Sequence, residues 1–495
     1  MLTLKDYVNW GLTHCDKVES AEGVPLVMEN CKQSKKMKEL EVYGNSIQNG
    51  TPSPEAPVEV ESVGEKCTKN LFDVEQFEAE LQHGYVLNDA GEKTSDKIST
   101  YSTYKIPIYV GQPIHIYGWF QRYYVYDAND VFVKRSGNYI NSIMNSTYTP
   151  TEDGYIRLQI QNANYNANKG KEHIELGDVH TEYEPYGKYK IPVTVRGKNL
   201  YDAKSYPMTV GYYVNGQTGV IPANDSYAAT LSYIPCVNLQ RKQITINHTG
   251  GSNPGIAYYD ENKAYISGNK NNSSTKITSI VPDNAYYYRF CIRAEYVDVA
   301  QVELGEVPTD FEPYTEPQTT NIYLNEPLRK IGDYADVLDF KNKKVMRNIR
   351  EVVFSGGELV YTWSIINGKV YGTDKLYTDA NLSYFAYDND THPRSTHFVT
   401  EANKASDVLN INEWTVLPSY RIGFVFSDDV SRDDANSWMQ SQYDAGTPVK
   451  CYYALSASVS EPIECELPKL TAKTSIVEID TTLLPSNIKG KYIKK

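Results

Sequence analysis

The chain has 495 residues, of which 40% are hydrophobic and 22% charged, a balance typical of a folded protein rather than a disordered one. Its formal net charge of −13 argues against nucleic acid or an anionic membrane as the main partner, because an acidic surface is repelled by both. The seven cysteines are scattered and form no CxxC pair, so we expect free thiols made in a reducing cytoplasm.

The first 64 residues predict a helix followed by strands and a connector. From Thr3 to about Ser20, apolar residues recur on one helical face, and this helix docks either on a β-sandwich or on a partner or second copy. Val24 to Tyr43 is strand-like, whereas Asn45 to Pro57 is rich in turn residues. No secretion signal or membrane-spanning run is visible, so we expect a soluble protein.

Two long segments repeat each other. KNLFD at Lys69 and KNLYD at Lys198 lie 198 − 69 = 129 residues apart. Each is followed by a matching close, IELGDVHTEYEPY at Ile174 and VELGEVPTDFEPY at Val302. Between them YDANDVFV is echoed by YDENKAYI, and YIRLQI by YYRFCI. A period this long predicts that each copy is a domain.

Within both copies, short β-rich runs alternate with clusters of Gly, Asn, Asp and Pro. This texture predicts an all-β chain with tandem β-sandwich domains of jelly-roll type. We place the copies at residues 65–187 and 188–316, after an N-terminal helix and connector at residues 1–64. The segment YKIPVTVR between the copies is expected to form a strand that joins them.

Residues 317–495 form a third β-rich region with one helix. Ser431 is the expected N-cap, Asp433 and Asp434 fall in the first turn, and Gly446 follows the end. VKCYYALSASV is expected to be a central strand, and a terminal strand with a basic tail follows Lys473.

No pattern for catalysis, a metal or a cofactor is recognisable. The eight histidines show neither HExxH nor Cys/His spacing, and no phosphate-binding glycine motif occurs. The acidic pairs near Asp428 and Asp433 are explained by a helix start. We therefore expect no enzyme, no cofactor and no metal.

The repeats suggest a binding face instead. Arg157 and Arg289 alternate with apolar residues and leave the core side of their strands, as do Glu175 and Glu303. Each Arg and Glu would pair across neighbouring strands or form a polar floor for a ligand. Aromatic rings stack on sugars, so we selected these glycan-binding candidates: Trp119, Tyr123, Tyr124, Arg157, Tyr258, Tyr259 and Arg289. Packing in a core or interface is the alternative role for the rings, since the chain holds 43 tyrosines.

Several long phrases resemble tail and baseplate proteins of bacteriophages that infect Gram-positive bacteria. They are GNSIQNGTPSPEAPVEVESVG, the KNLFD/KNLYD openings, the ELG…EPY closings, NEPLRKIGDYADVLDF and TTLLPSNIKGKY. The resemblance implies a virion tail protein, made in the host cytoplasm, with modules similar to carbohydrate-binding domains. It also implies other tail or baseplate proteins and host-surface carbohydrate as partners, and a homo-oligomer, with a trimer favoured. The chain lacks the coiled-coil heptads of fibrous members.

The sequence thus predicts a non-enzymatic receptor-binding protein that attaches the virion to host glycans through repeated weak contacts. A structural spacer of the baseplate, without glycan binding, is the main alternative. A polysaccharide depolymerase is a further one, and it requires two carboxylates facing one groove.

Overall fold

The computed structural model describes most of the chain from residue 48 onward and three strands before it. The described residues are 17–19, 26–29, 39–43, 48, 50–60, 62–248, 255–270, 276–331, 334–339, 342–365, 368–374, 394–400, 411–417, 421–464, 475–479 and 489–493. Strands dominate, and the fold is all-β as expected.

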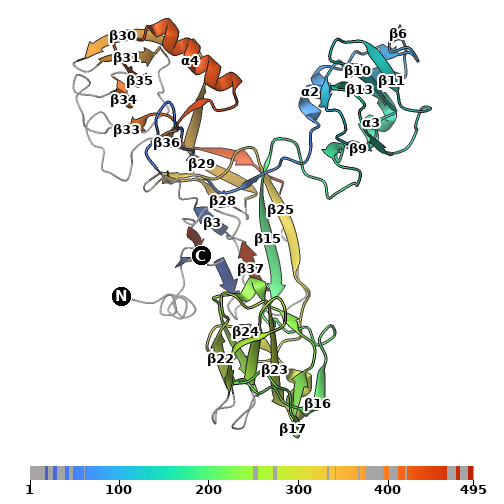
Figure 1. Ribbon diagram of the computed structural model, residues 1–495, viewed down its shortest axis with the longest axis vertical. Helices are drawn as coiled ribbons and strands as arrows, with labels where there is room; N and C mark the ends of the chain where they lie inside the picture. The colour runs from blue at the N-terminus through green and yellow to red at the C-terminus, as the bar shows by residue number, and fades with distance from the viewer. Residues whose placement is uncertain are drawn as a thin grey trace. The chain divides into compact units, whose positions relative to one another are not determined.

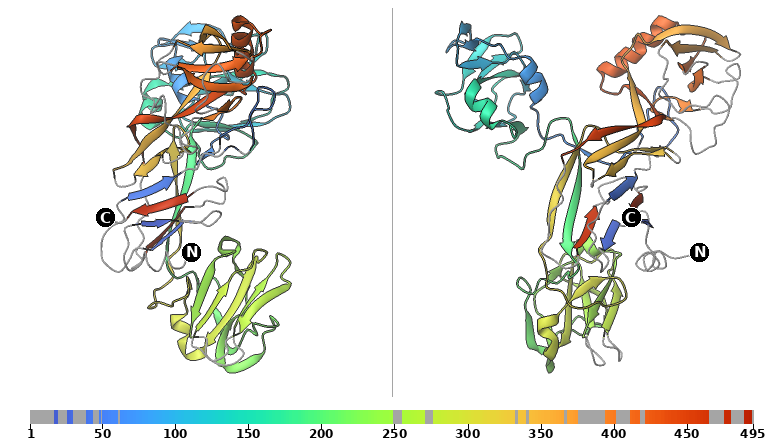
Figure 2. Two further views of the ribbon diagram at one scale, coloured as in Figure 1. Left: turned by 90° about the vertical axis from the view of Figure 1, so that its left-hand side faces the viewer. Right: turned by 180° about the vertical axis from the view of Figure 1, so that it is seen from behind.

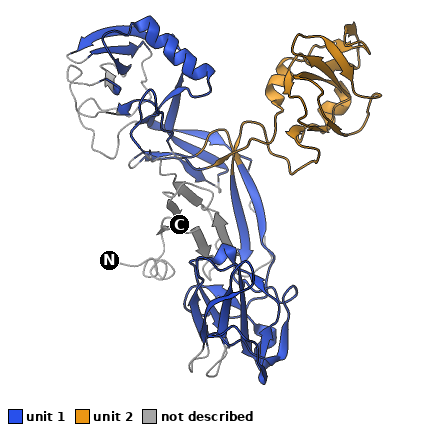
Figure 3. Ribbon diagram, viewed as in Figure 1, with its two compact units in different colours: residues 1–63, 191–322, 328–495 blue, residues 64–190, 323–327 orange. Residues whose placement is uncertain are grey.

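The chain divides into two compact units (Figure 3). Unit 2 comprises residues 64–190 and 323–327, and it contains the first repeat. Unit 1 comprises residues 1–63, 191–322 and 328–495, and it contains the second repeat and the C-terminal region.

The first repeat consists of two antiparallel sheets. The larger has the order β11-β10-β13-β7 with β8 also beside β13, and the smaller has the order β12-β9-β14. Their strands are β7 (Ser99–Tyr101), β8 (Ile106–Ile108), β9 (Ile114–Gly118), β10 (Arg122–Asp127), β11 (Phe132–Arg135), β12 (Met144–Tyr148), β13 (Gly154–Gln161) and β14 (His173–Leu176).

The second repeat has the same plan. Its larger sheet has the order β16-β17-β23-β20-β21 with β18 beside β23, and its smaller sheet has the order β22-β19-β24. Their strands are β16 (Met208–Tyr212), β17 (Ala223–Thr230), β18 (Ile234–Pro235), β19 (Gln243–Asn247), β20 (Gly255–Tyr259), β21 (Tyr265–Lys270), β22 (Lys276–Ile280), β23 (Tyr287–Arg293) and β24 (Val302–Leu304).

In each repeat the two sheets share one apolar core, which makes the arrangement sandwich-like. Strand β13 contributes Ile156, Leu158 and Ile160, each no more than 1% exposed, and the smaller sheet contributes residues such as Ile116. Strand β23 contributes its alternate residues to the matching core of the second repeat. The period-2 pattern of YIRLQI and YYRFCI therefore predicts the inward residues correctly. Leu176 follows Ile174 at the same period, but it is 56% exposed because it ends strand β14.

The repeated opening and closing phrases bind each other. Asn70 accepts hydrogen bonds at Oδ1 from the backbone N–H groups of Phe72 and Ile174. Asn199 does the same for Tyr201 and Val302. Because a buried backbone N–H group needs a partner, an asparagine at this point joins the beginning and the end of each repeat.

A lysine and a glutamate from the same phrases form a second pair. Lys198 Nζ lies 3.2 Å from Glu312, and the equivalent Lys69 lies 3.9 Å from Glu184. The repetition of these phrases is thus explained by the closure of the fold.

Short elements decorate the repeats. Helix α2 (Val74–Ala79) begins after Asp73, whose side chain accepts from the N–H groups of Glu75 and Gln76. The other elements are β4 (Glu65–Lys66), β5 (Tyr85–Leu87), β6 (Lys93–Ser95), α3 (Asn162–Asn168), η1 (Val237–Leu239) and η2 (Ala294–Val299).

The C-terminal region contains a helix packed on a five-stranded sheet (Figure 1). Helix α4 (Arg432–Asp444) starts with a capping box between Ser431 and Asp434, which confirms the predicted N-cap. Its Ala435 and Met439 are fully buried in a core with the sheet's inner residues. The sheet has the order β30-β31-β35-β34-β33, with strands β30 (Leu359–Ile365), β31 (Gly368–Thr373), β33 (Val399–Thr400), β34 (Glu413–Leu417) and β35 (Arg421–Phe426).

Two further sheets complete this region. The predicted central strand is β36 (Val449–Pro462), which pairs along most of its length with β29 (Lys344–Phe354). The remaining strands are β26 (Lys330–Ile331), β27 (Tyr334–Ala335), β28 (Val337–Asp339) and β32 (Arg394–Ser395). The turn-rich connector packs here as well, since Val58 N–H bonds to Thr396 and Val60 joins a core with Ile349.

Strands from both ends of the chain pair with one another. The order β1-β38-β3 joins β1 (Lys17–Glu19), β38 (Lys489–Ile493) and β3 (Glu39–Tyr43). The order β2-β37-β15-β25 joins β2 (Leu26–Glu29), β37 (Ser475–Ile479), β15 (Tyr189–Gly197) and β25 (Gln318–Leu324), of which β15 and β25 run side by side in Figure 2. Of the predicted helix from Thr3 to Ser20, residues 17–19 are strand instead, because they pair with β38, and the rest lies outside the described residues.

Candidate functional site

The predicted arginines lie on tyrosines rather than beside the predicted glutamates. Arg157 Cζ is 4.7 Å from the ring centroid of Tyr126, and Arg289 Cζ is 5.4 Å from that of the equivalent Tyr259. Glu175 and Glu303 lie on the smaller sheets, so the expected cross-strand Arg–Glu pair is wrong in both repeats. Alternation places a side chain on a face but does not say which sheet the strand joins.

These Arg–Tyr contacts belong to a second small core on the outer face of each larger sheet. In the first repeat it contains Tyr101, Tyr124, Tyr126 and Tyr155, and in the second it contains Tyr259. A turn that contains a glycine covers each of these outer cores. The Tyr126 hydroxyl donates to the carbonyl of Gly91 and the Tyr259 hydroxyl to that of Gly219, both at 2.8 Å. The outer tyrosines therefore stabilise the repeat.

Burial separates the predicted glycan-binding residues into two groups. Tyr123 and Tyr258 belong to the main cores, Tyr124 and Tyr259 to the outer cores, and all four are at most 6% exposed. A ring buried in this way has no free face for a sugar. Trp119 is half-buried against the main core of the first repeat. Arg157 and Arg289 are also half-buried, and each keeps a buried Nε without a hydrogen-bond partner among the described residues.

An exposed aromatic pair lies elsewhere, on strand β30 of the C-terminal region. Tyr361 is 38% and Trp363 39% exposed. Their ring centroids are 5.8 Å apart and the ring planes differ by 29°, so the two rings are adjacent and nearly parallel. The sequence does not reveal this pair, because a strand with Tyr and Trp at alternate positions is equally typical of a core.

A bulge in β30 explains why these rings face outward. The register of β30 with β31 shifts between Leu359 and Tyr361. Leu359 belongs to the core with helix α4, and without the shift Tyr361 would share its side of the sheet. The bulge turns Tyr361 and Trp363 to the opposite face, a known use of bulges at binding surfaces.

Arg421 fixes a guanidinium beside this pair. Its Cζ lies 4.1 Å from the Tyr361 ring centroid, and its Nη2 donates to the Tyr361 hydroxyl at 3.1 Å. Its Nε is buried and has no hydrogen-bond partner within the described part of the chain. We call Tyr361, Trp363 and Arg421 the aromatic platform.

One cavity in unit 2 has a volume of about 170 Å³. It is smaller than typical ligand pockets of about 300–1,000 Å³. Its lining includes the carboxylates of Asp73 and Glu172, but Asp73 caps α2 and Glu172 accepts from the N–H of Gly170 at 2.7 Å. Both carboxylates therefore already accept hydrogen bonds from backbone N–H groups.

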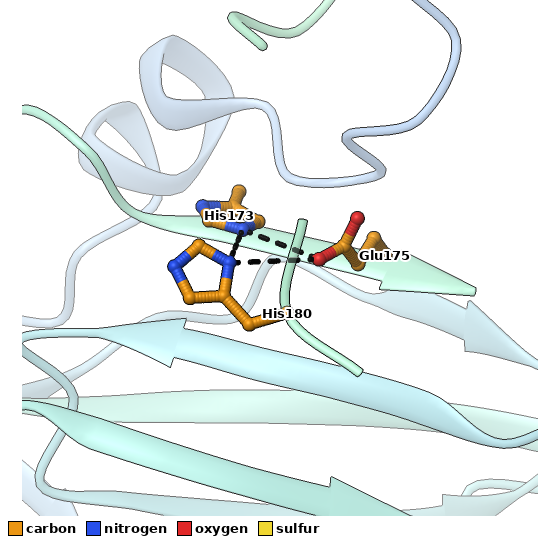
Figure 4. Close-up of side chains that lie close together, drawn as sticks. All are labelled: His173, Glu175 and His180. Atoms are coloured by element: carbon orange, nitrogen blue, oxygen red, sulfur yellow. Dashed lines mark hydrogen bonds and ion pairs between the residues drawn. The ribbon is translucent and has the colours of Figure 1, made fainter. Parts of the chain in front are cut away.

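Three metal-ligand side chains do gather, contrary to the expectation from spacing. Ligand atoms of His173, Glu175 and His180 all lie within 4.8 Å of one another (Figure 4). Burial raises the pKa of Glu175, but hydrogen bonds from Thr181 and the nearby histidines outweigh it, so the pKa is lowered and the carboxylate is ionised at neutral pH. The sequence missed the group because a loop brings His180 back to the strand.

No model of a known protein family matches this chain, and comparison with curated proteins and with solved structures finds no match either. Among the described residues, none of the helices has the length and apolar character needed to cross a membrane.

Proposed function

We propose that this protein is a non-catalytic attachment protein of a bacteriophage tail or baseplate, and that it binds glycans on the host surface. The observation that carries the glycan part is the aromatic platform on strand β30. The long phrases that resemble phage tail proteins, such as GNSIQNGTPSPEAPVEVESVG and NEPLRKIGDYADVLDF, support the virion part.

The platform has the chemistry that sugar recognition uses. The apolar face of a pyranose stacks on an aromatic ring, and planar polar groups beside the ring bind its hydroxyls. Tyr361 and Trp363 supply two adjacent, nearly parallel rings, and Arg421 supplies guanidinium donors beside the Tyr361 ring. A sugar chain lying along β30 would contact both rings.

Repetition in an oligomer would turn such weak contacts into firm attachment. A shallow site on an edge strand is expected to bind a single sugar weakly. When several copies of the chain act together, the second and later contacts form at high effective concentration, and avidity exceeds each affinity. We propose that the two repeats hold the aromatic platform on the virion. Arg157 and Arg289 would add polar contacts to the glycan from the repeats themselves.

The test is binding of the full-length chain to an array of bacterial cell-surface glycans. Replacing Trp363 by Ala should weaken binding to the recognised glycan by roughly tenfold or more, as truncation of a central aromatic contact usually does. Tyr361→Ala should have a similar effect. Tyr443→Ala is the matched control, because Tyr443 is 48% exposed on helix α4 and should leave binding unchanged.

The outcomes separate the alternatives. Equal binding by wild type and Trp363→Ala would refute the platform. Absence of binding to every glycan would favour a structural spacer whose exposed rings contact other tail proteins. Release of soluble fragments from a polysaccharide would instead indicate a depolymerase.

A further inference from the structure

Strand β14 presents two potential metal ligands on one face. His173 and Glu175 are two residues apart, so their side chains leave the strand on the side opposite Ile174, which is buried in the main core. The turn after β14 brings His180 back over them (Figure 4). The three groups thus converge from a strand and its following loop.

The separations of the three ligand atoms fit a single metal ion. His173 Nε2 is 3.2 Å from His180 Nδ1 and 3.5 Å from Glu175 Oε1, and His180 Nδ1 is 3.8 Å from Glu175 Oε1. The nearest point equidistant from the three atoms lies in their plane, about 2.0 Å from each, which is the length of Zn²⁺ bonds to His nitrogen and carboxylate oxygen.

Neighbouring groups orient two of these ligands. His173 Nδ1 lies 3.1 Å from the carbonyl oxygen of Lys171, and because a carbonyl only accepts, Nδ1 carries the proton. The Nε2 lone pair of His173 therefore faces the cluster. Glu175 accepts from the Thr181 N–H and hydroxyl, both at 2.6 Å, and each carboxylate oxygen keeps a further lone pair. Such supporting hydrogen bonds are typical around metal ligands.

The surroundings combine a buried floor with one accessible side. The side chains of His173 and Glu175 are 2% and 4% exposed, whereas that of His180 is 33% exposed. His115 lies directly across from Glu175 in the sheet register and so shares its face. Its Nε2 is buried and has no hydrogen-bond partner in the part of the chain that the structure describes.

The second repeat shows that the fold does not need these histidines. Glu303 keeps the same bonds, accepting from the Thr309 N–H and hydroxyl at 2.7 Å. The position of His173 is taken by Gln301, which donates to Glu303 at 3.0 Å, and that of His180 by Pro308. The hydrogen bonds between the glutamate and the threonine are therefore structural in both repeats. The two imidazoles occur beside them in the first repeat only.

We propose that His173, Glu175 and His180 bind one divalent transition-metal ion. Two imidazoles and a carboxylate suit Zn²⁺, and three protein ligands leave a fourth position for water or an external donor. This site is independent of the aromatic platform, and its test does not depend on glycan binding.

The test is calorimetric titration of Zn²⁺ into the untagged full-length chain after treatment with a chelator. Wild type should bind one ion per chain with a dissociation constant of roughly micromolar or below. His173→Gln should weaken binding by more than the roughly 10–100-fold that loss of a supporting hydrogen bond costs. The same titration with Co²⁺ should give visible absorption bands of a four-coordinate ion in wild type alone.

Two variants control the test. His173→Gln introduces the residue that the second repeat carries at this position, so it should fold, and circular dichroism without metal checks this. His83→Gln changes an exposed histidine outside the cluster and should bind Zn²⁺ as wild type does. Absence of Zn²⁺ binding by wild type, or equal affinity of wild type and His173→Gln, would overturn the proposal.

Discussion

Replacement of Asn199 by Ala should destabilise the second repeat by several kcal/mol. The Asn199 side chain is 3% exposed and makes four hydrogen bonds: it accepts from the N–H groups of Tyr201 and Val302, and donates to the carbonyls of Ala300 and Glu312. At a net contribution of about 0.5–1.5 kcal/mol each, the four bonds contribute about 2–6 kcal/mol, and alanine leaves all four backbone groups without this partner.

Hydrogen exchange of the full-length chain, followed by mass spectrometry, measures this loss locally. A destabilisation of about 3 kcal/mol should accelerate exchange roughly 100-fold in peptides that contain Tyr201 and Val302. Peptides of the first repeat should not change. Asn70→Ala is the matched variant, with two acceptor bonds to lose and a correspondingly smaller effect confined to the first repeat. Exchange in Asn199→Ala within about threefold of wild type would refute the closing role of the asparagine.

Two further predictions concern the buried parts of both repeats. Gly91→Ala should destabilise unit 2 by at least about 1 kcal/mol more than Gly84→Ala in thermal unfolding. Both glycines have positive φ, but only at Gly91 would the added Cβ lie 2.4 Å from the Phe132 ring. Equal destabilisation by the two substitutions would contradict this packing. Burial raises the pKa of the Cys236 and Cys291 thiols to about 12, so both should resist alkylation near neutral pH in the native protein. Because the unfolded pKa is near 9.0, their stabilising contribution should be complete below that pH and decline as the pH rises toward 12. Peptide mapping after labelling checks the thiols, and rapid native labelling would show them to be accessible.

The sequence predicted the elements whose pattern is local. Alternation identified Ile156, Leu158 and Ile160 as core residues, and the sequence signals of α4 located its start at Ser431. These features depend on neighbours along the chain, namely the two-residue period of a strand and the capping of a helix.

The features that the sequence did not predict depend on contacts between distant segments. By sequence, Tyr124 and Tyr259 are candidates for glycan binding, but a turn around Gly91 or Gly219 covers the outer face of each larger sheet. Alternation distinguishes two faces and cannot say that both are buried. The outward direction of Trp363 depends on a bulge, which residue periodicity does not reveal.

The most direct test of the account is the fluorescence of Trp363 during titration with a glycan that the array identifies. If a sugar stacks on the aromatic platform, binding should change the tryptophan emission of the full-length wild type, and Trp363→Phe should bind the glycan with the emission change abolished. A change of the same size in wild type and Trp363→Phe, at equal saturation, would show that the glycan binds elsewhere and would contradict the platform as the attachment site.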